Sequence, residues 1–158
     1  MRKFEKISFE QFKKDVNDDL KLYNEYPMPE RSTKNSAGYD IYSIESGVVN
    51  PGKSRVFKTG LKVCMNHDEV LMIYSRSSQG YKNDVCLTNS VGVIDSDFYN
   101  NSANEGHFSV KLSNHGDKDY FVNVGDKIAQ GVFIKYLIVD DEKEIKSERS
   151  GGLGSTGK

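Results

Sequence analysis

The stretch of this 158-residue chain that most suggests chemistry runs from Ser90 to Phe98 and reads S-V-G-V-I-D-S-D-F. It begins as an apolar run typical of a buried strand, is interrupted by Gly92, and then presents the carboxylate of Asp95. Glycine lets another group approach the backbone closely, and a carboxylate at a strand end can act as a general base or contact a metal ion. The alternative is a hairpin whose acidic residues, Asp97 included, only form its turn.

Two other stretches carry groups that bind phosphate. Residues 75–80 follow an apolar run and place Arg76 among hydroxyl groups, and a guanidinium suits the oxygens of a phosphate. Residues 151–158 read G-G-L-G-S-T-G-K, and Arg149 lies just before them. Successive glycine amides and hydroxyls can surround phosphate oxygens. The motif G-x-x-x-x-G-K at residues 152–158 does not indicate a P-loop fold here, because no Ser/Thr and no helical pattern follow Lys158. The alternatives are a plain surface loop and a disordered polar tail.

Carboxylates, two arginines, hydroxyls and a glycine-rich segment together suit phosphate-ester chemistry with a divalent cation. Oxygen ligands and phosphates favour Mg²⁺ over softer metals. The three histidines have no metal-ligand spacing with the cysteines, and no His or Cys arrangement indicates a covalent intermediate. Cys64 and Cys86 are predicted to be a reduced, buried pair of thiols.

The overall charge is balanced, with 22 Lys and Arg against 23 Asp and Glu. We therefore expect no attraction of the whole chain to nucleic acid or to an anionic membrane. The sequence has no run of 18 apolar residues and no apolar signal core near Met1. These features predict a cytoplasmic protein without a membrane span.

The pattern of the chain changes twice. In residues 1–25, Ser8 precedes apolar residues at three- and four-residue steps, which predicts one amphipathic helix that ends near Leu22 and forms an N-terminal extension. The recurring apolar residues are Phe9, Phe12, Val16 and Leu20. Residues 26–140 contain many short strand-like runs between turn signals, which predicts an all-β domain, a jelly-roll-like β-sandwich or distorted barrel. Residues 141–158 are predicted to be a flexible Gly-rich arm that closes the active site.

Five stretches of the chain, in order, resemble the five motifs of the trimeric deoxyuridine triphosphate nucleotidohydrolase (dUTPase) family. They are residues 37–43 (AGYDIYS), 76–78 (RSS), 89–98 (NSVGVIDSDF), 125–130 (GDKIAQ) and 149–157 (RSGGLGSTG). One such motif is weak evidence, whereas five in order with sensible spacing are highly specific.

The resemblance implies a homotrimer that hydrolyses dUTP to dUMP and pyrophosphate with Mg²⁺. Asp95 would orient and activate the water that attacks the α-phosphorus, and Asp40 would support the metal through water. The phosphate chain would be contacted by Arg76, Ser77, Ser78 and Gln130. A neighbouring subunit would lend Arg149, the second catalytic residue. The tail of that subunit would close over the outer phosphates through Gly152, Leu153, Gly154, Ser155 and Thr156.

The same resemblance divides the stretch of residues 89–98 into roles. The uracil edge would be read by Asn89 and by the hairpin backbone at Gly92, Val93 and Ile94. Phe98 would stack on the sugar and leave no room for a 2′-hydroxyl.

Several features depart from the family pattern. Phe98 stands where tyrosine is usual, and Leu153 stands where a phenylalanine usually covers the uracil. Residues 99–105 look like an insertion. Alternative functions are a dCTP deaminase, or a nucleotide-switched binding protein that uses the N-terminal helix and this insertion as partner surfaces. A structural jelly-roll subunit needs none of the five motifs.

Overall fold

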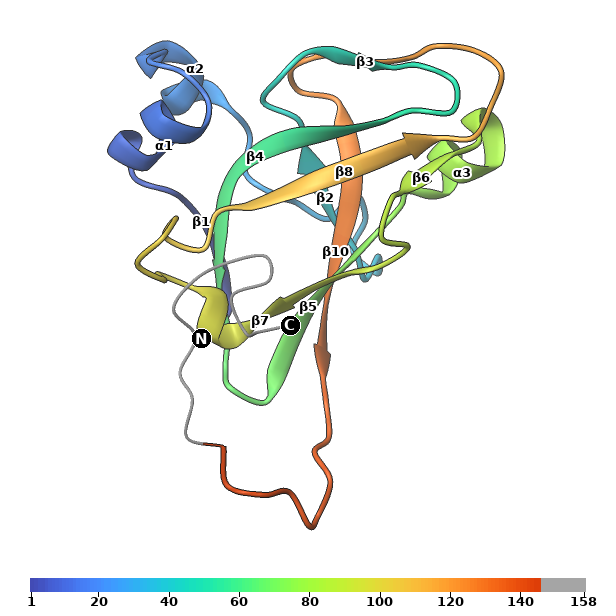
Figure 1. Cartoon of the computed structure of the whole chain (residues 1–158). Helices are drawn as coiled ribbons and strands as arrows, with labels where there is room; N and C mark the ends of the chain where they lie inside the picture. The colour runs from blue at the N-terminus through green and yellow to red at the C-terminus, as the bar shows by residue number, and fades with distance from the viewer. Residues whose placement is uncertain (146–158) are drawn as a thin grey trace.

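The computed structural model describes residues 1–145 of the chain (Figure 1). The strands are β1 (Lys3–Lys6), β2 (Tyr39–Tyr42), β3 (Gly47–Val49), β4 (Ser54–Cys64), β5 (Glu69–Tyr74), β6 (Val85–Leu87), β7 (Gly92–Asp95), β8 (Phe108–Asn114), β9 (Tyr120–Val122) and β10 (Lys127–Lys135). The helices are α1 (Phe9–Asp15), α2 (Leu20–Glu25) and α3 (Ser77–Asn83), with a 3₁₀ turn at Ser96–Phe98. The predicted all-β class is confirmed. Within residues 1–145, no helix is long and apolar enough to span a membrane.

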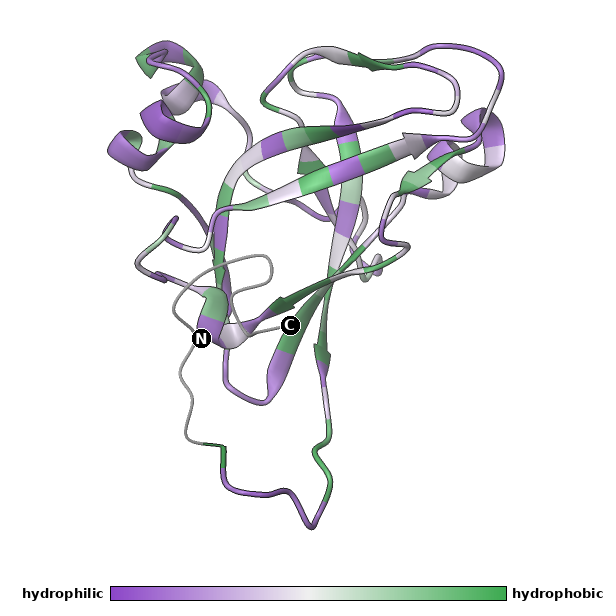
Figure 2. Ribbon diagram, in the orientation of Figure 1, coloured by the Kyte–Doolittle hydropathy of each residue, from purple (hydrophilic) through white to green (hydrophobic). Residues whose placement is uncertain are grey.

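Two four-stranded antiparallel sheets share one hydrophobic core. Their strand orders are β1-β4-β8-β6 and β2-β10-β5-β7, and β3 pairs with β9 in a separate small sheet. Alternation decides which side chains enter the core: along β8, Phe108, Val110 and Leu112 are buried while Ser109 and Lys111 are exposed. Figure 2 shows this change of hydrophobic and hydrophilic residues along β8. Such alternation is what one buried sheet face requires.

The prediction of one N-terminal helix is wrong, because the helical pattern is broken between Val16 and Leu20. Asp19 caps a second helix by accepting a hydrogen bond from the backbone of Leu22 at 2.9 Å. Asn and Asp favour caps and turns over helix interiors, and the three residues before α2 are Asn-Asp-Asp. Ser8 caps α1, as predicted. Leu20 is exposed rather than packed on the predicted apolar face.

The N-terminal segment is also part of the sheet, which the helical pattern did not indicate. Strand β1 pairs with β4, and the ring of Phe4 lies 5.5 Å from those of Tyr39 and Phe133. Helices α1 and α2 lie beside β4 (Figure 1). Phe12 of α1 is fully buried there and stacks on Tyr26. Both cysteine thiols are free, as predicted, but they are half-buried rather than buried.

A bulge in β4 holds the N-terminal segment in place. The pairing of β4 with β8 shifts between Lys58 and Leu61, and Gly60 there has a φ of 69°. The Gly60 carbonyl accepts hydrogen bonds from the backbone of Ile7 at 3.0 Å and from the Tyr26 hydroxyl at 2.8 Å. A Cβ at this position would lie 2.8 Å from the Tyr26 ring, so only glycine fits.

His107 joins the same bulge to α1. Its Nε2 accepts a hydrogen bond from the Gly60 N–H at 3.0 Å, so Nδ1 carries the proton and donates to Asp15 at 2.5 Å. Burial lowers the pKa of His107 below its ordinary value of 6.5, although Asp15 opposes the shift. The imidazole is therefore neutral in the folded protein at neutral pH.

We predict that His107 makes the fold sensitive to mild acid. The unfolded chain takes up this proton more readily than the folded chain, so stability is complete above about pH 6.5 and is lost as the pH falls below it. Between about pH 7.5 and about pH 5.5, the free energy of unfolding should fall because of this group, since the unfolded imidazole becomes protonated in this range and the folded one resists protonation. Chemical denaturation at the two pH values measures it. His107→Gln should remove the loss, while the exposed His115→Gln should keep it. An unchanged loss in His107→Gln contradicts the assignment.

Candidate functional site

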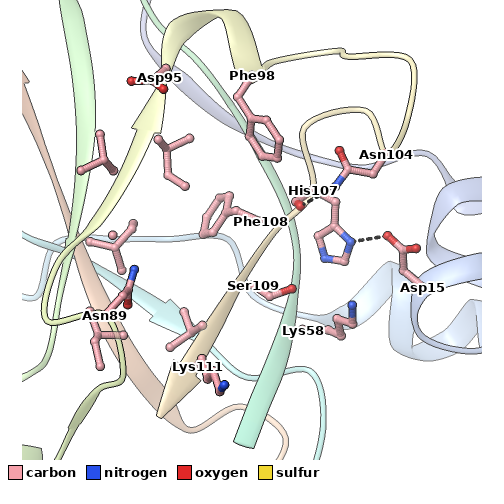
Figure 3. A pocket seen from close by; sticks show the side chains of 16 residues that line it. Asp15, Lys58, Asn89, Asp95, Phe98, Asn104, His107, Phe108, Ser109 and Lys111 are labelled. Carbon is pink, nitrogen blue, oxygen red and sulfur yellow. Dashed lines mark hydrogen bonds and ion pairs between the residues drawn. The ribbon is translucent and has the colours of Figure 1, made fainter. Parts of the chain in front are cut away.

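A cavity of about 450 Å³ opens between β7 and β8 (Figure 3). One wall carries all six residues predicted to read the base, hold the sugar or activate water: Asn89, Gly92, Val93, Ile94, Asp95 and Phe98. The opposite side is apolar at Phe108 and Val110. A polar rim is formed by Asp15, Lys58, Asn104, His107, Ser109 and Lys111. The fold thus gathers the predicted residues of this stretch around one space. Asp97, which we treated as a turn residue, does not line it.

A tight turn brings Asn89 beside β7. The N–H of Ser90 donates to the Leu87 carbonyl at 3.0 Å, and Ser90 has a φ of 61°. Strand β7 then pairs with β5, and a Cβ at Gly92 would lie 3.1 Å from Cβ of Ile73. Glycine therefore lets the two strands lie close together. Because β7 is the last strand of its sheet, the backbone groups along its outer edge stay outside the ladder.

Asp95 and Phe98 are placed by the end of β7. Asp95 is the last residue of the strand, and its side chain is exposed at the mouth of the cavity. The 3₁₀ turn that follows carries the half-buried ring of Phe98 to the same side, across from Phe108 (Figure 3). A carboxylate and an aromatic ring therefore border one end of the cavity.

The pair of Asp15 and His107 at the rim was not predicted, because no local pattern relates residues so far apart in the chain. The geometry resembles that of an acid–base pair, since a carboxylate holds one imidazole nitrogen. The other nitrogen already accepts the Gly60 N–H, and the His107 side chain is only 1% exposed. His107 has no nitrogen left to exchange a proton with a ligand, so this pair is structural.

A second polar cluster surrounds Asp40 at the beginning of β2. Its carboxylate accepts hydrogen bonds from Lys127 Nζ at 2.7 Å, Ser32 Oγ at 2.6 Å and Arg76 Nε at 3.2 Å. Burial alone would raise the pKa of Asp40, but Lys127, Ser32 and Arg76 outweigh it and hold the pKa below its ordinary value of 3.8. The carboxylate is therefore ionised and faces two cations, so the cluster is net positive.

The predicted phosphate contacts lie around this cluster. Residues 75–80, for which a plain surface loop was the alternative, lead into α3, and Arg76 is the residue before the helix. Ser77 and Ser78 are exposed at its beginning. The Gln130 amide donates to the Ser75 carbonyl at 3.1 Å. The helix forms despite Gly80 because the side chain and backbone of Gln79 close the first turn on Arg76.

The two groups of predicted residues do not meet within one chain. None of Asp40, Arg76, Ser77, Ser78 and Gln130 lines the cavity that contains Asp95. Asp40 is on β2 and Asp95 on β7, which are opposite edges of the sheet β2-β10-β5-β7. The two residues are also offset along the strands. On β5, Asp40 is level with Tyr74, to which it is related through Gln130 of β10, whereas Asp95 pairs with Val70. With strands about 4.8 Å apart and a rise of about 3.3 Å per residue, they lie on the order of 15–20 Å apart.

The described part of the chain forms no cage for a metal ion. Within residues 1–145, no group of three His, Cys, Asp or Glu side chains could hold one. Mg²⁺ is commonly bound through one or two carboxylates together with waters and substrate phosphates. Asp40, with its oxygens already engaged by cations and a hydroxyl, fits only a contact through water to an ion that phosphates also hold.

The remaining predicted site residues, Arg149, Gly152, Leu153, Gly154, Ser155 and Thr156, lie outside the described residues.

Comparison with known proteins relates the whole β-domain to one family. The dUTPase family matches residues 24–157. The deoxyuridine 5′-triphosphate nucleotidohydrolase of Lactococcus lactis is 47% identical over 131 residues, which are 82% of this chain and 87% of that protein. The crystal structure of the dUTPase from Streptococcus mutans has a TM-score of 0.71 and 35% identity, and the match covers 87% of this chain and 98% of that one.

A more distant structure shares the fold. It is a mutant dUTPase from phage phi11 of S. aureus, described with a structural Mg(II) ion. Its TM-score is 0.67 at 22% identity, over 93% of this chain and 97% of that one.

We predict that Asp40 stabilises the folded chain by separating two cations. Asp40→Asn leaves the Arg76 and Lys127 charges uncompensated at a site where the Asp40 side chain is only 9% exposed. The free energy of unfolding should fall by about 2 kcal/mol, less than for a fully buried pair because both cations reach solvent. Chemical denaturation measures the change. Asp68→Asn is the control, since its pair with Lys135 is exposed and its loss should leave stability unchanged. Equal effects of the two substitutions contradict the prediction.

Proposed function

The chain belongs to the dUTPase family, and from this membership we propose that it hydrolyses dUTP to dUMP and pyrophosphate with Mg²⁺. The observation that carries the proposal is the cavity between β7 and β8, which gathers Asn89, Asp95 and Phe98 around one space. The space has apolar walls, exposed backbone along one edge and a carboxylate at its mouth. The exposed backbone can pair with the edge of a base, an apolar wall can pack on a sugar, and the carboxylate can activate a water molecule beside the first phosphate.

The base and the sugar would bind along β7. The amide of Asn89 and the outer backbone edge of Gly92–Ile94 offer the paired donors and acceptors that a uracil edge needs. The ring of Phe98 would stack on the sugar and exclude a 2′-hydroxyl. This ring has no hydroxyl group of its own, so it discriminates by shape alone.

Asp95 would hold one water molecule in line with the α-phosphorus and accept its proton. Phosphoryl substitution depends mainly on positioning and charge neutralisation, so no covalent intermediate is needed. When bound, Mg²⁺ would neutralise charge on the triphosphate; the phage phi11 dUTPase with its structural Mg(II) ion has this fold. Asp40 would contact the metal through water, beside the cations that hold its carboxylate.

The phosphate chain would be held by groups from the Asp40 side of the sheet. The proposed contacts are Arg76, Ser77, Ser78 and Gln130. Arg149 would act on the developing charge, as an arginine finger does in related chemistry. The tail would close over the outer phosphates through Gly152, Leu153, Gly154, Ser155 and Thr156.

We propose that the active form is a homotrimer whose sites are shared between subunits. Asp95 and Asp40 lie at opposite edges of one sheet, so a nucleotide that contacts both must lie between two copies of the chain. The segment after β10 also exposes apolar side chains, with Leu137 97% and Ile138 66% exposed. An exposed apolar run of this kind is typical of an interface.

The proposed ligand is the nucleotide dUTP, and we propose no binding to nucleic acid or to a membrane. The net charge of −1 offers no field for a polyanion. Two free thiols suit a reducing compartment, so we propose that the protein acts in the cytoplasm.

The test of the function is pyrophosphate release from dUTP, compared with UTP, dTTP and dCTP. Ammonia release from dCTP in place of pyrophosphate from dUTP would reject the proposal in favour of a deaminase.

We predict that Asp95→Asn retains nucleotide binding and assembly but loses turnover. An amide is a far weaker base than a carboxylate, so kcat should fall by about 10²–10⁴-fold. Steady-state kinetics and calorimetry with dUDP measure the two properties. Asp97→Asn is the matched control, because Asp97 is the neighbouring carboxylate and does not line the cavity. Near wild-type turnover in Asp95→Asn would exclude Asp95 as the base.

We predict that two inactive variants restore activity when they assemble together. Asp95→Asn and Arg76→Ala damage opposite edges of the sheet, so a mixed trimer contains some sites with both residues intact. Co-expression in equal amounts should recover about a quarter of wild-type turnover, because random assembly of a symmetric ring leaves that share of sites whole. Absence of recovery in demonstrably mixed trimers would contradict shared sites.

A further inference from the structure

The loop of residues 99–106 begins directly after Phe98 and contains one buried polar side chain. Asn101 is 8% exposed, while its neighbours Asn100 and Ser102 are exposed. Buried amides are normally retained only when their hydrogen bonds are satisfied. What Asn101 binds therefore indicates what the loop is built to hold.

Asn101 ties the loop to the backbone of Phe98. Its Nδ2 donates to the Phe98 carbonyl at 2.8 Å and to Asn104 Oδ1 at 2.9 Å. Its Oδ1 accepts the backbone N–H groups of Ala103 at 3.0 Å and Asn104 at 3.1 Å. One end of the amide therefore shapes the loop and the other end holds Phe98.

The far end of the loop packs against the same carbonyl. Gly106 has a φ of 87°, and a Cβ there would lie 2.6 Å from the Phe98 oxygen and 3.0 Å from Cα of Tyr99. The loop thus closes around the Phe98 carbonyl from both ends.

The outer side of the loop is anchored to the N-terminal segment and to β4. Glu105 accepts hydrogen bonds from the Ser8 hydroxyl at 2.5 Å and the Ser8 backbone at 2.9 Å, and its carboxylate lies 3.2 Å from Lys62 Nζ. The Tyr99 hydroxyl donates to Glu5. These contacts give the loop a fixed base from which it can position Phe98.

We infer that Asn101 is a positioning residue that sets the Phe98 ring over the sugar and so determines selectivity for deoxyribose over ribose. The inference rests on the proposed function, in which this ring excludes the 2′-hydroxyl. A phenylalanine ring has no polar atom by which to be held, so its position must be imposed through its backbone and its packing. Asn101 does not line the cavity, and it acts only through Phe98.

The test is Asn101→Asp, which is nearly isosteric. The carboxylate can still accept the loop N–H groups, but it can no longer donate to the Phe98 carbonyl. Calorimetry on the full-length protein would measure the ratio of affinities for dUDP and UDP. We expect this ratio to fall by on the order of tenfold, because a ring that is no longer held in place can move aside and admit the 2′-hydroxyl.

Asn114→Asp is the matched control. Asn114 is also a buried amide, with Nδ2 donating to the carbonyls of Val49 and Lys118 and Oδ1 accepting the Gly116 N–H. Asn114 lies at the end of β8 away from Phe98. Asn114→Asp should lower the stability of the fold by a similar amount, but it should leave the ratio of affinities for dUDP and UDP unchanged. An equal fall in both variants, or no fall in Asn101→Asp, overturns the inference.

A second variant covers the case in which Asn101→Asp does not fold. Glu105→Gln weakens the outer anchor and should lower the ratio in the same direction but by a smaller factor; an unchanged ratio overturns the inference. A wild-type protein that binds dUDP no better than UDP also overturns it. A wild-type protein that discriminates between these ligands but does not hydrolyse dUTP contradicts the proposed function alone, because nucleoside diphosphate binding is independent of turnover.

Discussion

The left-handed backbone of Gly60 is the constraint on which the rest of the structure depends. The bulge turns both its carbonyl and its N–H out of the ladder of β4. The carbonyl holds Ile7 and Tyr26 of the N-terminal segment, and the N–H holds His107 at the beginning of β8. A side chain at position 60 would collide with Tyr26. One glycine therefore joins the N-terminal segment, the longest strand and the strand that forms one wall of the cavity.

The cavity between β7 and β8 is connected to this junction. His107 ends the loop that begins after Phe98, and Glu105 of that loop is bound to Ser8 at the beginning of α1. The residues that look like an insertion therefore satisfy their own hydrogen bonds and contact the N-terminal segment, and they reach the backbone of Phe98 through Asn101. The N-terminal segment, which sequence patterns treat as an extension, is part of the same unit.

The cluster around Asp40 is built independently, at the other edge of the second sheet. Ionic contacts with Arg76 and Lys127 keep its carboxylate charged. Two strands, β10 and β5, separate this cluster from Asp95, and this separation is why the proposed site is shared between chains. The separation of the two clusters and the exposed apolar segment after β10 are the two observations that support the proposed assembly.

The sequence by itself determined the all-β class, the strand that ends in Asp95, the cap at Ser8 and the identity of the candidate site residues. These depend on alternation, caps and motif spacing, which are local. Tertiary structure alone decided that Asn89, Asp95 and Phe98 share a cavity with β8, that Asp15 binds His107, and that α1 ends before Leu20. It also decided that Asp40 and Asp95 lie apart. Pairing between distant segments follows from packing and strand order, and no local pattern encodes which distant backbone a side chain will meet.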